Sequence, residues 1–417
     1  MTFEAEMIVP QEGTDDLGQA AHASITFLKY RLILGHRKDE GRRTLGGIEL
    51  LSEELSHVKI GEANSHLKFP HDYIWFKSAV RGQRRTPWFI STDTEDSGAK
   101  VIRIHQDGGS SGKPRPLLAA NLPRTAVSAA NAAESPTAML VKREMQSWRR
   151  LQLEPSALRR PDPFTAPTKM GAEGSHLPAT LHDLARLSVA GTNGAPGGAD
   201  RIYSRLANRL SELIDDVHLV KVDRDEKREL LTLQVCGRDG TLHPARALSD
   251  GTLRFLALAV IELDPEFHGV LCLEEPENGI HPARIPAMLR LLQDIATDVS
   301  SPIGSDNPLR QVIVNTHSPT VVAQVPEDAL VMAEAKNVTR EGQTFRKLSF
   351  SCLPGTWRAK SGEMDLISKG ELLSYLSPVV SEPEELTLSG EKVEIPKKRV
   401  IDRQEFQMSL SLGGTSG

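Results

Sequence analysis

The feature that most constrains this chain is a short apolar run that ends on two carboxylates. Residues 270–273 (VLCL) are followed directly by Glu274 and Glu275. An unbroken apolar run of this kind is typical of a strand buried on both faces of a parallel sheet. Ligands bind at the carboxyl ends of such strands, so paired carboxylates there indicate a functional site. Taken alone, a solvated acidic loop after a core strand explains the same residues equally well.

A second apolar stretch downstream brings another polar side chain to the same place. Residues 311–315 (QVIVN) predict a buried strand that precedes His317, and residues 283–297 between the two strands predict a helix. A strand–helix–strand unit gives parallel neighbours with a right-handed crossover. Both carboxyl ends then lie on one edge of the sheet, and we expect His317 close to Glu274 and Glu275.

Residues 248–252 (LSDGT) predict the start of a third element, a helix with a polar first turn. Ser249 or Asp250 can cap this helix, and Gly251 allows a phosphate to approach the free backbone N–H groups. An ordinary helix cap accounts for the same residues. The positions expected to pack into the core are Leu253, Phe255, Leu256, Leu258 and Ile261.

The stretches LSDGT, VLCLEEPENGIHP and VIVNTHSP together resemble motifs of a known family. In order and spacing they are similar to the signature motif, the Walker B and D-loop segment, and the switch histidine of ABC-type ATPases. The closest resemblance is to the RecF/SMC-like group in its short form without a coiled coil, described as AAA-family ATPases. The resemblance implies an α/β fold of the P-loop NTPase type, with a parallel sheet flanked by helices, an antiparallel β lobe and a helical insertion.

The resemblance also implies an ATPase site that uses ATP and Mg²⁺. Glu274 takes the place of the metal-associated Walker B acid, where the wider family usually has Asp. Glu275 takes the place of the general base that polarises the attacking water. His317 takes the place of the residue that contacts the γ-phosphate.

Other matched residues are implied to act across a homodimer that forms with ATP bound. Ser249 and Gly251 correspond to residues that contact the γ-phosphate held by the second subunit. Asn278 belongs to the nucleotide site by the same resemblance, and with His281 it lines the dimer contact. Asp250 stands where transporter signatures have Gly, and an acid near a phosphate is unfavourable unless it points away.

One motif of the family has no counterpart in this sequence. ATP phosphates are held by a G-x-x-x-x-G-K-[ST] loop, which lies well before the signature in this fold. The nearest match is residues 107–115 (DGGSSGKPR), where Asp107 replaces the first glycine and Pro114 replaces the hydroxyl residue. Two interpretations stay open: the chain lacks its first segment, or another polypeptide supplies the loop.

The composition changes along the chain predict four segments. Residues 1–106 form a β-rich part of the first ATPase lobe, and 107–199 form a loop-rich and helical insertion. Residues 200–378 form the ATPase core, and 379–417 form a polar tail. Strands of an antiparallel meander are expected at 23–34, 46–60, 71–80 and 99–105, and helices at 138–152, 179–189 and 200–214.

The totals are ordinary for a soluble globular protein. The chain has 417 residues, of which 39% are hydrophobic and 25% charged, with a net charge of −5. Its three cysteines, Cys236, Cys272 and Cys352, are odd in number and widely spaced, as expected of reduced residues in a cytoplasmic protein. No run of about 18 apolar residues occurs, so we expect no membrane span.

Three other functions fit parts of the sequence. A transporter subunit is disfavoured because LSDGT and EEPENGIHP differ from the usual transporter motifs. A nuclease would use Asp223 and Asp225, but their place in an apparent hairpin turn explains both charges. The third alternative is a non-hydrolysing interaction or scaffold protein derived from such an ATPase, favoured by the missing phosphate loop.

DNA is a further possible partner, with a role in DNA repair or genome defence implied by the resemblance. Because the net charge is negative, a solvated surface is the simpler explanation of the basic clusters. The clusters are Arg81, Arg84 and Arg85; Arg149 and Arg150; and Arg159 and Arg160, with Trp88 and Trp148 nearby in sequence.

Overall fold

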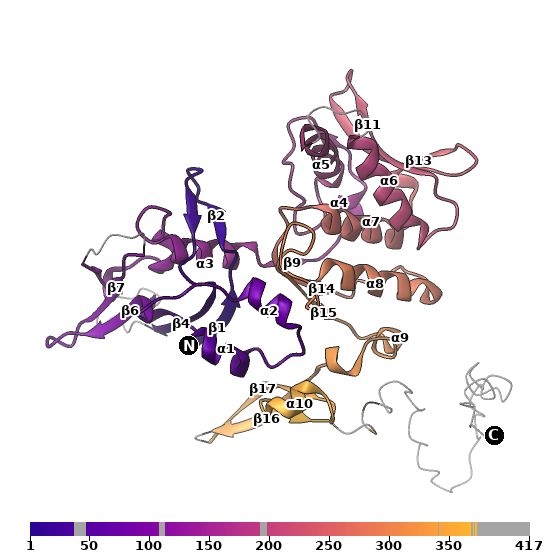
Figure 1. The fold of residues 1–417 in the computed structure, drawn as a ribbon. Coiled ribbons are helices and arrows are strands. Elements are labelled where there is room, and N and C mark those ends of the chain that lie inside the picture. Colours follow the sequence, from indigo (N-terminus) through magenta and orange to yellow (C-terminus); the bar gives the residue numbers. More distant parts are fainter. Residues whose placement is uncertain are drawn as a thin grey trace, which may run out of the picture. The chain divides into compact units, whose positions relative to one another are not determined.

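The computed structural model describes residues 1–36, 47–107, 113–191, 198–340, 342–367, 370 and 372. Met1–Ser377 form one compact unit, and the predicted polar tail lies outside the described residues. The elements of the first part of the chain are β1 (Thr2–Ile8), β2 (Glu12–Thr14), β3 (Ala20–His22), β4 (Phe27–His36), β5 (Ile48–His57), α1 (Ile60–His66), α2 (Tyr73–Ala79), β6 (Trp88–Thr94), β7 (Lys100–Ile104) and β8 (Arg115–Leu118) (Figure 1).

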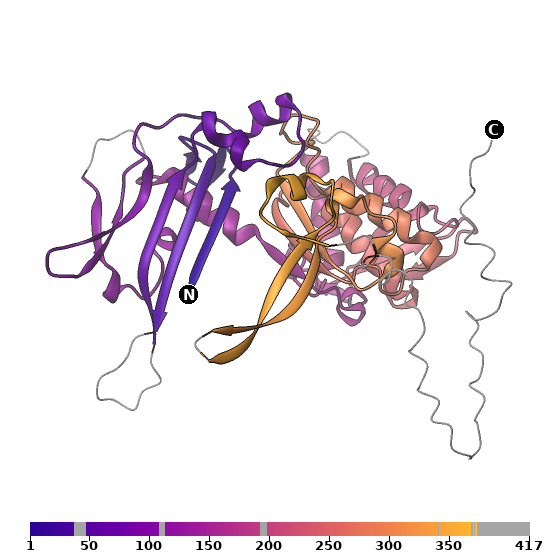
Figure 2. The same cartoon turned by 90° about the horizontal axis from the view of Figure 1, so that it is seen from below.

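This first part is built on a six-stranded antiparallel sheet in the order β1-β4-β5-β6-β7-β8, whose long strands lie side by side in Figure 2. Apart from β1, neighbouring strands follow one another in sequence, which confirms the predicted meander. The sheet contributes Leu28, Leu55 and Ile102 to a core that also contains Met139 and Leu140 of helix α3 (Pro136–Ser147). We call this part, residues 1–107 and 113–118, the β lobe.

The prediction of a strand at 71–80 was wrong, because this stretch contains helix α2. Trp75 and Ala79 are buried at the i, i+4 spacing of one helix face, whereas Tyr73 and Ile74 are 75% and 54% exposed. The aromatic and β-branched residues that suggested a strand therefore lie on opposite sides of a short helix. Burial on one face overrides their β propensity.

The predicted helix over 138–152 was too long at its carboxyl end. Helix α3 ends at Ser147, and Trp148 adopts extended backbone with φ −65° and ψ 122°. Arg149–Leu151 then form β9, which pairs in parallel with β14 (Gly269–Glu274). Three residues show too little periodicity to be recognised as a strand, so only the pairing partner reveals it.

The middle of the chain contains α4 (Pro155–Leu158), β10 (Asp162–Pro163), α5 (Leu177–Gly191), α6 (Gly198–Ser211), β11 (Leu219–Asp225), β12 (Leu230–Cys236), β13 (Leu242–Pro244) and three 3-10 turns, η1 (Ala119–Asn121), η2 (Val127–Ala129) and η3 (Ala245–Ala247). The predicted helices at 179–189 and 200–214 correspond to α5 and α6. The charged segment around 219–236 forms the expected hairpin, with β11 and β12 antiparallel.

A parallel sheet follows, in the order β15-β14-β9, with β15 at Arg310–Asn315. Its helices are α7 (Asp250–Leu263) and α8 (Ile285–Ile295), the latter preceded by the 3-10 turn η4 (Pro282–Arg284). Leu271 and Leu273 of β14 belong to the same core cluster as residues of α7 and α8. All five positions expected to pack on the LSDGT helix are buried. The predicted α/β class, with a flanked parallel sheet and an antiparallel lobe, is confirmed.

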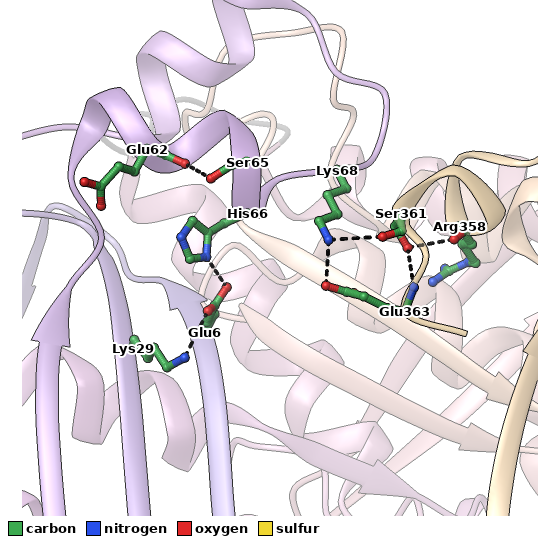
Figure 3. A network of polar contacts seen from close by, with 9 residues as sticks. All are labelled: Glu6, Lys29, Glu62, Ser65, His66, Lys68, Arg358, Ser361 and Glu363. Carbon is green, nitrogen blue, oxygen red and sulfur yellow. Dashed lines mark hydrogen bonds and ion pairs between the residues drawn. The ribbon is translucent and has the colours of Figure 1, made fainter. Parts of the chain in front are cut away.

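The last described segment of the chain includes a hairpin, and its final helix contacts the β lobe. It contains α9 (Pro319–Val322), η5 (Glu327–Ala329), β16 (Met332–Arg340), β17 (Gln343–Cys352), α10 (Trp357–Ser361) and β18 (Asp365–Leu366). Lys68 Nζ lies 2.7 Å from Glu363 Oε1 and 3.4 Å from the Ser361 carbonyl oxygen (Figure 3). Phe69 packs edge-on against Trp357. Segments almost 300 residues apart are thereby joined.

Candidate functional site

The two predicted strands are parallel neighbours, and their register places the polar residues at one edge. Pairing runs from Gly269 opposite Arg310 to Glu274 opposite Asn315. The Glu275 N–H continues it, donating to the Asn315 carbonyl oxygen at 2.8 Å. On the other side of β14, Leu273 pairs with Leu151. The carboxyl ends of β9, β14 and β15 therefore lie together at the edge that carries Glu274 and Glu275.

Glu275 has an unusual backbone. Its φ is +43°, in the left-handed region that residues with a side chain seldom occupy. Asn278 holds this turn in two ways: its N–H donates to the Glu275 carbonyl oxygen at 3.1 Å, and its Nδ2 donates to Glu275 Oε2 at 2.7 Å. A strained residue whose carboxylate is oriented by a neighbour is typical of functional sites.

A cavity of about 200 Å³ opens beside these carboxylates. It brings together three of the predicted site residues, Glu274, Glu275 and Asn278, while Ser249, Gly251 and His317 do not line it. The remaining lining residues come from β9, the segment after it, and the adjoining elements: Leu151, Gln152, Leu153, Glu154, Arg254, Leu273 and Pro276.

The signature turn is held by local contacts. Ser249 caps α7, with its Oγ accepting from the Thr252 N–H at 3.2 Å. Asp250 forms an ion pair with Arg159, which also donates to the Leu248 carbonyl oxygen at 3.0 Å. The carboxylate that stands in place of a glycine is therefore neutralised by a neighbouring guanidinium.

Gly251 is needed for a close approach of two backbone segments. A Cβ on this residue would lie 2.2 Å from the Gly279 carbonyl oxygen. The signature turn and the loop after Glu275 therefore pack directly on each other within one chain. This contact by itself explains why a glycine stands at this position.

His317 is exposed just beyond β15. The neighbouring Thr316 donates its hydroxyl to Glu277 Oε1, and the Ser318 N–H donates to Thr316 Oγ1 at 3.0 Å. His281 is also exposed, and its Nδ1 accepts from the Ala283 N–H at 3.2 Å, capping η4. The roles assigned to both histidines by resemblance stay predictions.

Four residues near this edge were missed from the sequence: Gln152, Arg254, Glu277 and Thr316. Arg254 donates from Nη1 to the Asn278 carbonyl oxygen at 2.5 Å and from Nε to the Leu153 carbonyl oxygen at 3.1 Å. It is a basic residue within the apolar stretch of α7, and this was the available signal. Gln152 gave no signal, because the strand before it is only three residues long.

The oxygen donors at this edge suit Mg²⁺, which takes one or two carboxylates and completes its shell with water and phosphate oxygens. Across the described residues, no group of three or more His, Cys, Asp or Glu side chains is arranged to hold a metal ion. Glu274 and Glu275 fit a metal that is shared with phosphates.

Contacts within the fold account for Asp225, considered for a nuclease site, and for Asp107, considered for the phosphate loop. Asp225 Oδ1 accepts the N–H groups of Lys227 and Arg228 at 3.0 and 3.1 Å, as a turn residue does. Asp223, in contrast, lies within β11 opposite Thr232, so its placement in the turn was wrong. Asp107, the first residue of the nearest phosphate-loop match, is buried against Arg84 and accepts the Thr137 N–H at 3.0 Å. Residues 108–112 of that match lie outside the described residues.

The basic clusters are partly used inside the protein. Arg84 pairs with Asp107 and lies 4.2 Å from the centroid of the Phe89 ring, and Arg159 pairs with Asp250. Arg149 lies 5.3 Å from the Phe267 ring centroid. These contacts favour the structural interpretation of one arginine in each cluster.

A comparison with protein families supports, over part of the chain, the resemblance to AAA-family ATPases seen in the sequence. Residues 192–323 match the family model described as "AAA domain, putative AbiEii toxin, Type IV TA system". The matched segment contains all six predicted site residues. No curated protein matches the chain.

Solved structures of SMC head domains also align with the chain. The Smc head domain with a coiled coil and joint from Pyrococcus yayanosii is 11% identical, with a TM-score of 0.25 over 44% of this chain and 32% of that chain. The SmcHead bound to the C-winged helix domain of ScpA is 9% identical, with a TM-score of 0.32 over 77% of this chain and 74% of that chain. This chain spans about a third of the first of these structures. No helix within the described residues has the length and apolar character needed to span a membrane.

Proposed function

We propose that this chain binds and hydrolyses ATP with Mg²⁺ at the carboxyl edge of β14. The observation that carries the proposal is the parallel register of β14 and β15, which sets Glu274 and Glu275 beside Asn315 at a cavity. In this site Glu274 holds the metal, Glu275 is the general base for the attacking water, and His317 contacts the γ-phosphate. When bound, Mg²⁺ neutralises charge on the phosphate oxygens.

Two identical chains complete the site in this proposal. By their resemblance to the signature motif, Ser249 and Gly251 act on a nucleotide held by a second copy. The test mixes a Ser249→Ala chain with a Glu275→Gln chain, each in a form that contains a phosphate loop. The mixture should regain one working site per heterodimer. If no mixing ratio restores activity, the composite site is wrong.

The phosphate loop is proposed to come from a segment that pairs with the parallel sheet, either joined to this chain or on another polypeptide. In the described residues β15 pairs only with β14, and Ile313 on β15 is 49% exposed. Parallel sheets are normally covered on both faces. The exposure of Ile313 therefore supports a further segment that packs on this sheet. The residues 1–417 alone are then expected to bind ATP weakly.

The experiment compares three proteins: the 417-residue chain, a chain joined to a strand, phosphate loop and helix, and the joined chain with Glu275→Gln. ATP with Mg²⁺ should raise Tm only in the two joined proteins, because ligand binding stabilises by mass action. Phosphate release should occur only in the joined protein with Glu275, since Gln keeps the phosphate contacts without the base. Strong hydrolysis by the 417-residue chain would show that the phosphates bind elsewhere.

Genome defence is the proposed setting, supported by the family model whose description names a putative toxin of a toxin–antitoxin system. DNA repair was the other role implied by the sequence resemblance. DNA is proposed as a partner in either case. Titration with duplex DNA at increasing salt concentration tests this. When a protein contacts DNA phosphates, the logarithm of its binding constant falls linearly with the logarithm of the salt concentration. Absence of binding at low salt would remove DNA from the proposal.

The alternative function, a non-hydrolysing scaffold protein, makes a different prediction. A protein of this kind would show no ATP-dependent stabilisation in any of the three forms above. Its partner would bind equally well with and without nucleotide. The ATP thermal shift therefore separates the two functions before any turnover is measured.

A further inference from the structure

Glu277 is a buried carboxylate that the proposed chemistry does not use. It is 7% exposed, more buried than either Glu274 or Glu275. Its Oε1 accepts the Thr316 hydroxyl, while its Oε2 is buried without a hydrogen-bond partner among the described residues. Burying a carboxylate is costly unless its contacts compensate. Such a group needs an explanation beyond surface charge.

The Thr316 hydroxyl that meets Glu277 also fixes the turn that contains His317. Thr316 Oγ1 accepts the Ser318 N–H at 3.0 Å. Ser318 in turn caps α9, with its Oγ accepting from the Val321 N–H at 3.4 Å. The residues on both sides of His317 are therefore held by hydrogen bonds, and the first of them depends on Glu277.

Glu277 also belongs to the turn that contains Glu275. The Ile280 N–H donates to the Glu277 carbonyl oxygen at 2.9 Å, and the Asn278 N–H donates to that of Glu275 at 3.1 Å. Asn278 is linked from its side chain to Glu275 and from its carbonyl oxygen to Arg254. A displacement of Glu277 would therefore change the orientation of the Glu275 carboxylate.

We propose that Glu277 and Thr316 are positioning residues that fasten the His317 turn to the Glu275 turn. Backbone pairing between β14 and β15 goes no further than the Glu275 N–H bond to the Asn315 carbonyl oxygen, so beyond it the two turns need a side-chain contact to keep a fixed separation. The inference deepens the proposed function and rests on it for its catalytic meaning. The contact itself is measurable without nucleotide, so the two can fail independently.

Hydrogen exchange of the full chain tests the coupling. Thr316→Val removes the hydroxyl and keeps the side-chain shape, whereas Thr316→Ser keeps the hydroxyl. Because hydrogen bonds to charged groups are among the stronger ones, we expect exchange of amides 278–281 to rise roughly tenfold in the Val variant. The Ser variant should match the unmodified protein. Thr316→Ala repeats the measurement if the Val variant does not fold.

A matched control removes a hydroxyl contact elsewhere. Thr339 Oγ1 lies 3.2 Å from Thr344 Oγ1 in the β16–β17 hairpin, so Thr339→Val should leave amides 278–281 unchanged. Unchanged exchange at 278–281 in folded Thr316→Val and Thr316→Ala proteins would overturn the proposal. A rise in the Thr339→Val control as large as that in Thr316→Val would also overturn it.

A spectroscopic readout follows His317 itself. The imidazole cross-peak, assigned by its loss in His317→Asn, should move in Thr316→Val and return in Thr316→Ser. A role limited to general stability would lower Tm without moving this peak selectively. A His317 peak that is identical in all Thr316 variants would show that Glu277 and Thr316 do not position it. If the peak moves but ATP never binds, the proposed ATPase function fails and the positioning contact stands.

Discussion

The antiparallel sheet of the β lobe and the parallel sheet β15-β14-β9 differ in how their faces are covered. In the β lobe, Leu55, Ile90 and Ile102 are fully buried on an antiparallel sheet. In the parallel sheet, Leu271 and Leu273 are buried, but Val270 and Cys272 on the opposite face are only half-buried. Their neighbour Ile313, paired with Cys272, is 49% exposed.

An antiparallel sheet commonly has one solvated face, whereas a parallel sheet rarely does. A partly exposed face would be ordinary in the β lobe, whereas the partly exposed face of the parallel sheet is a departure. The same apolar run that predicted a fully buried strand shows this departure at Val270 and Cys272. The comparison supports a covering segment on the parallel sheet, as proposed above.

The largest expected effects come from truncations on the buried faces, where the two sheets should behave alike. Leu271→Ala and Ile102→Ala both remove fully buried side chains and should each cost about 2–5 kcal/mol. Urea unfolding followed by circular dichroism measures both. A Leu271→Ala cost below about 1 kcal/mol would mean that the parallel sheet is loosely packed on both faces.

A smaller effect is expected from adding a methyl group to a close backbone contact. Gly251→Ala would place a Cβ against the Gly279 carbonyl oxygen and should cost about 1–3 kcal/mol. The control is Gly61→Ala in α1 of the β lobe, where no atom lies within 4 Å of the added Cβ. That variant should be neutral or slightly more stable, since Ala favours helix. Equal Tm values for both variants would contradict the close approach.

A pH-dependent difference is expected from Glu144, at the end of α3 nearest β14. Burial raises the pKa of this carboxyl, although a hydrogen bond from Trp148 acts in the opposite direction. Below the ordinary carboxyl pKa, Glu144 is protonated in both folded and unfolded chains. As pH rises through the raised folded pKa, the unfolded chain ionises more readily and stability is lost.

Glu144→Gln keeps an acceptor for Trp148 and does not titrate. Its Tm relative to the unmodified protein should therefore increase as pH rises from about 4 to about 8. Thermal unfolding at a series of pH values measures the difference. A Tm difference that is constant over this range would show that the Glu144 carboxyl titrates alike in both states.

The smallest effect on stability is expected on the partly exposed face of the parallel sheet. Ile313→Ala removes a side chain that is 49% exposed and should cost less than about 1 kcal/mol in the 417-residue chain. In a protein that carries the proposed covering segment, the same substitution should cost more, because the side chain becomes buried. Equal costs in both proteins would show that the segment does not cover this face.

Much of the parallel region could be predicted from the sequence. The apolar runs before Glu274 and before His317 predicted neighbouring parallel strands, and LSDGT predicted a helix capped by Ser249 or Asp250, of which the structure has Ser249. These features are local and strongly patterned, so propensity and periodicity agree. The helix α2 was missed because its short aromatic stretch fits a strand equally well until one face is known to be buried.

The sequence alone determined which residue types stand at the ends of the strands, because strand length and apolar patterning are local properties of the chain. Only the tertiary structure decided which side chains meet there. β9 entered the sheet through its pairing with β14, Arg159 neutralised Asp250 from 91 residues away, and Thr316 met Glu277 across two turns. Contacts between distant segments depend on how the whole chain packs around its core. This packing cannot be read from a local sequence pattern.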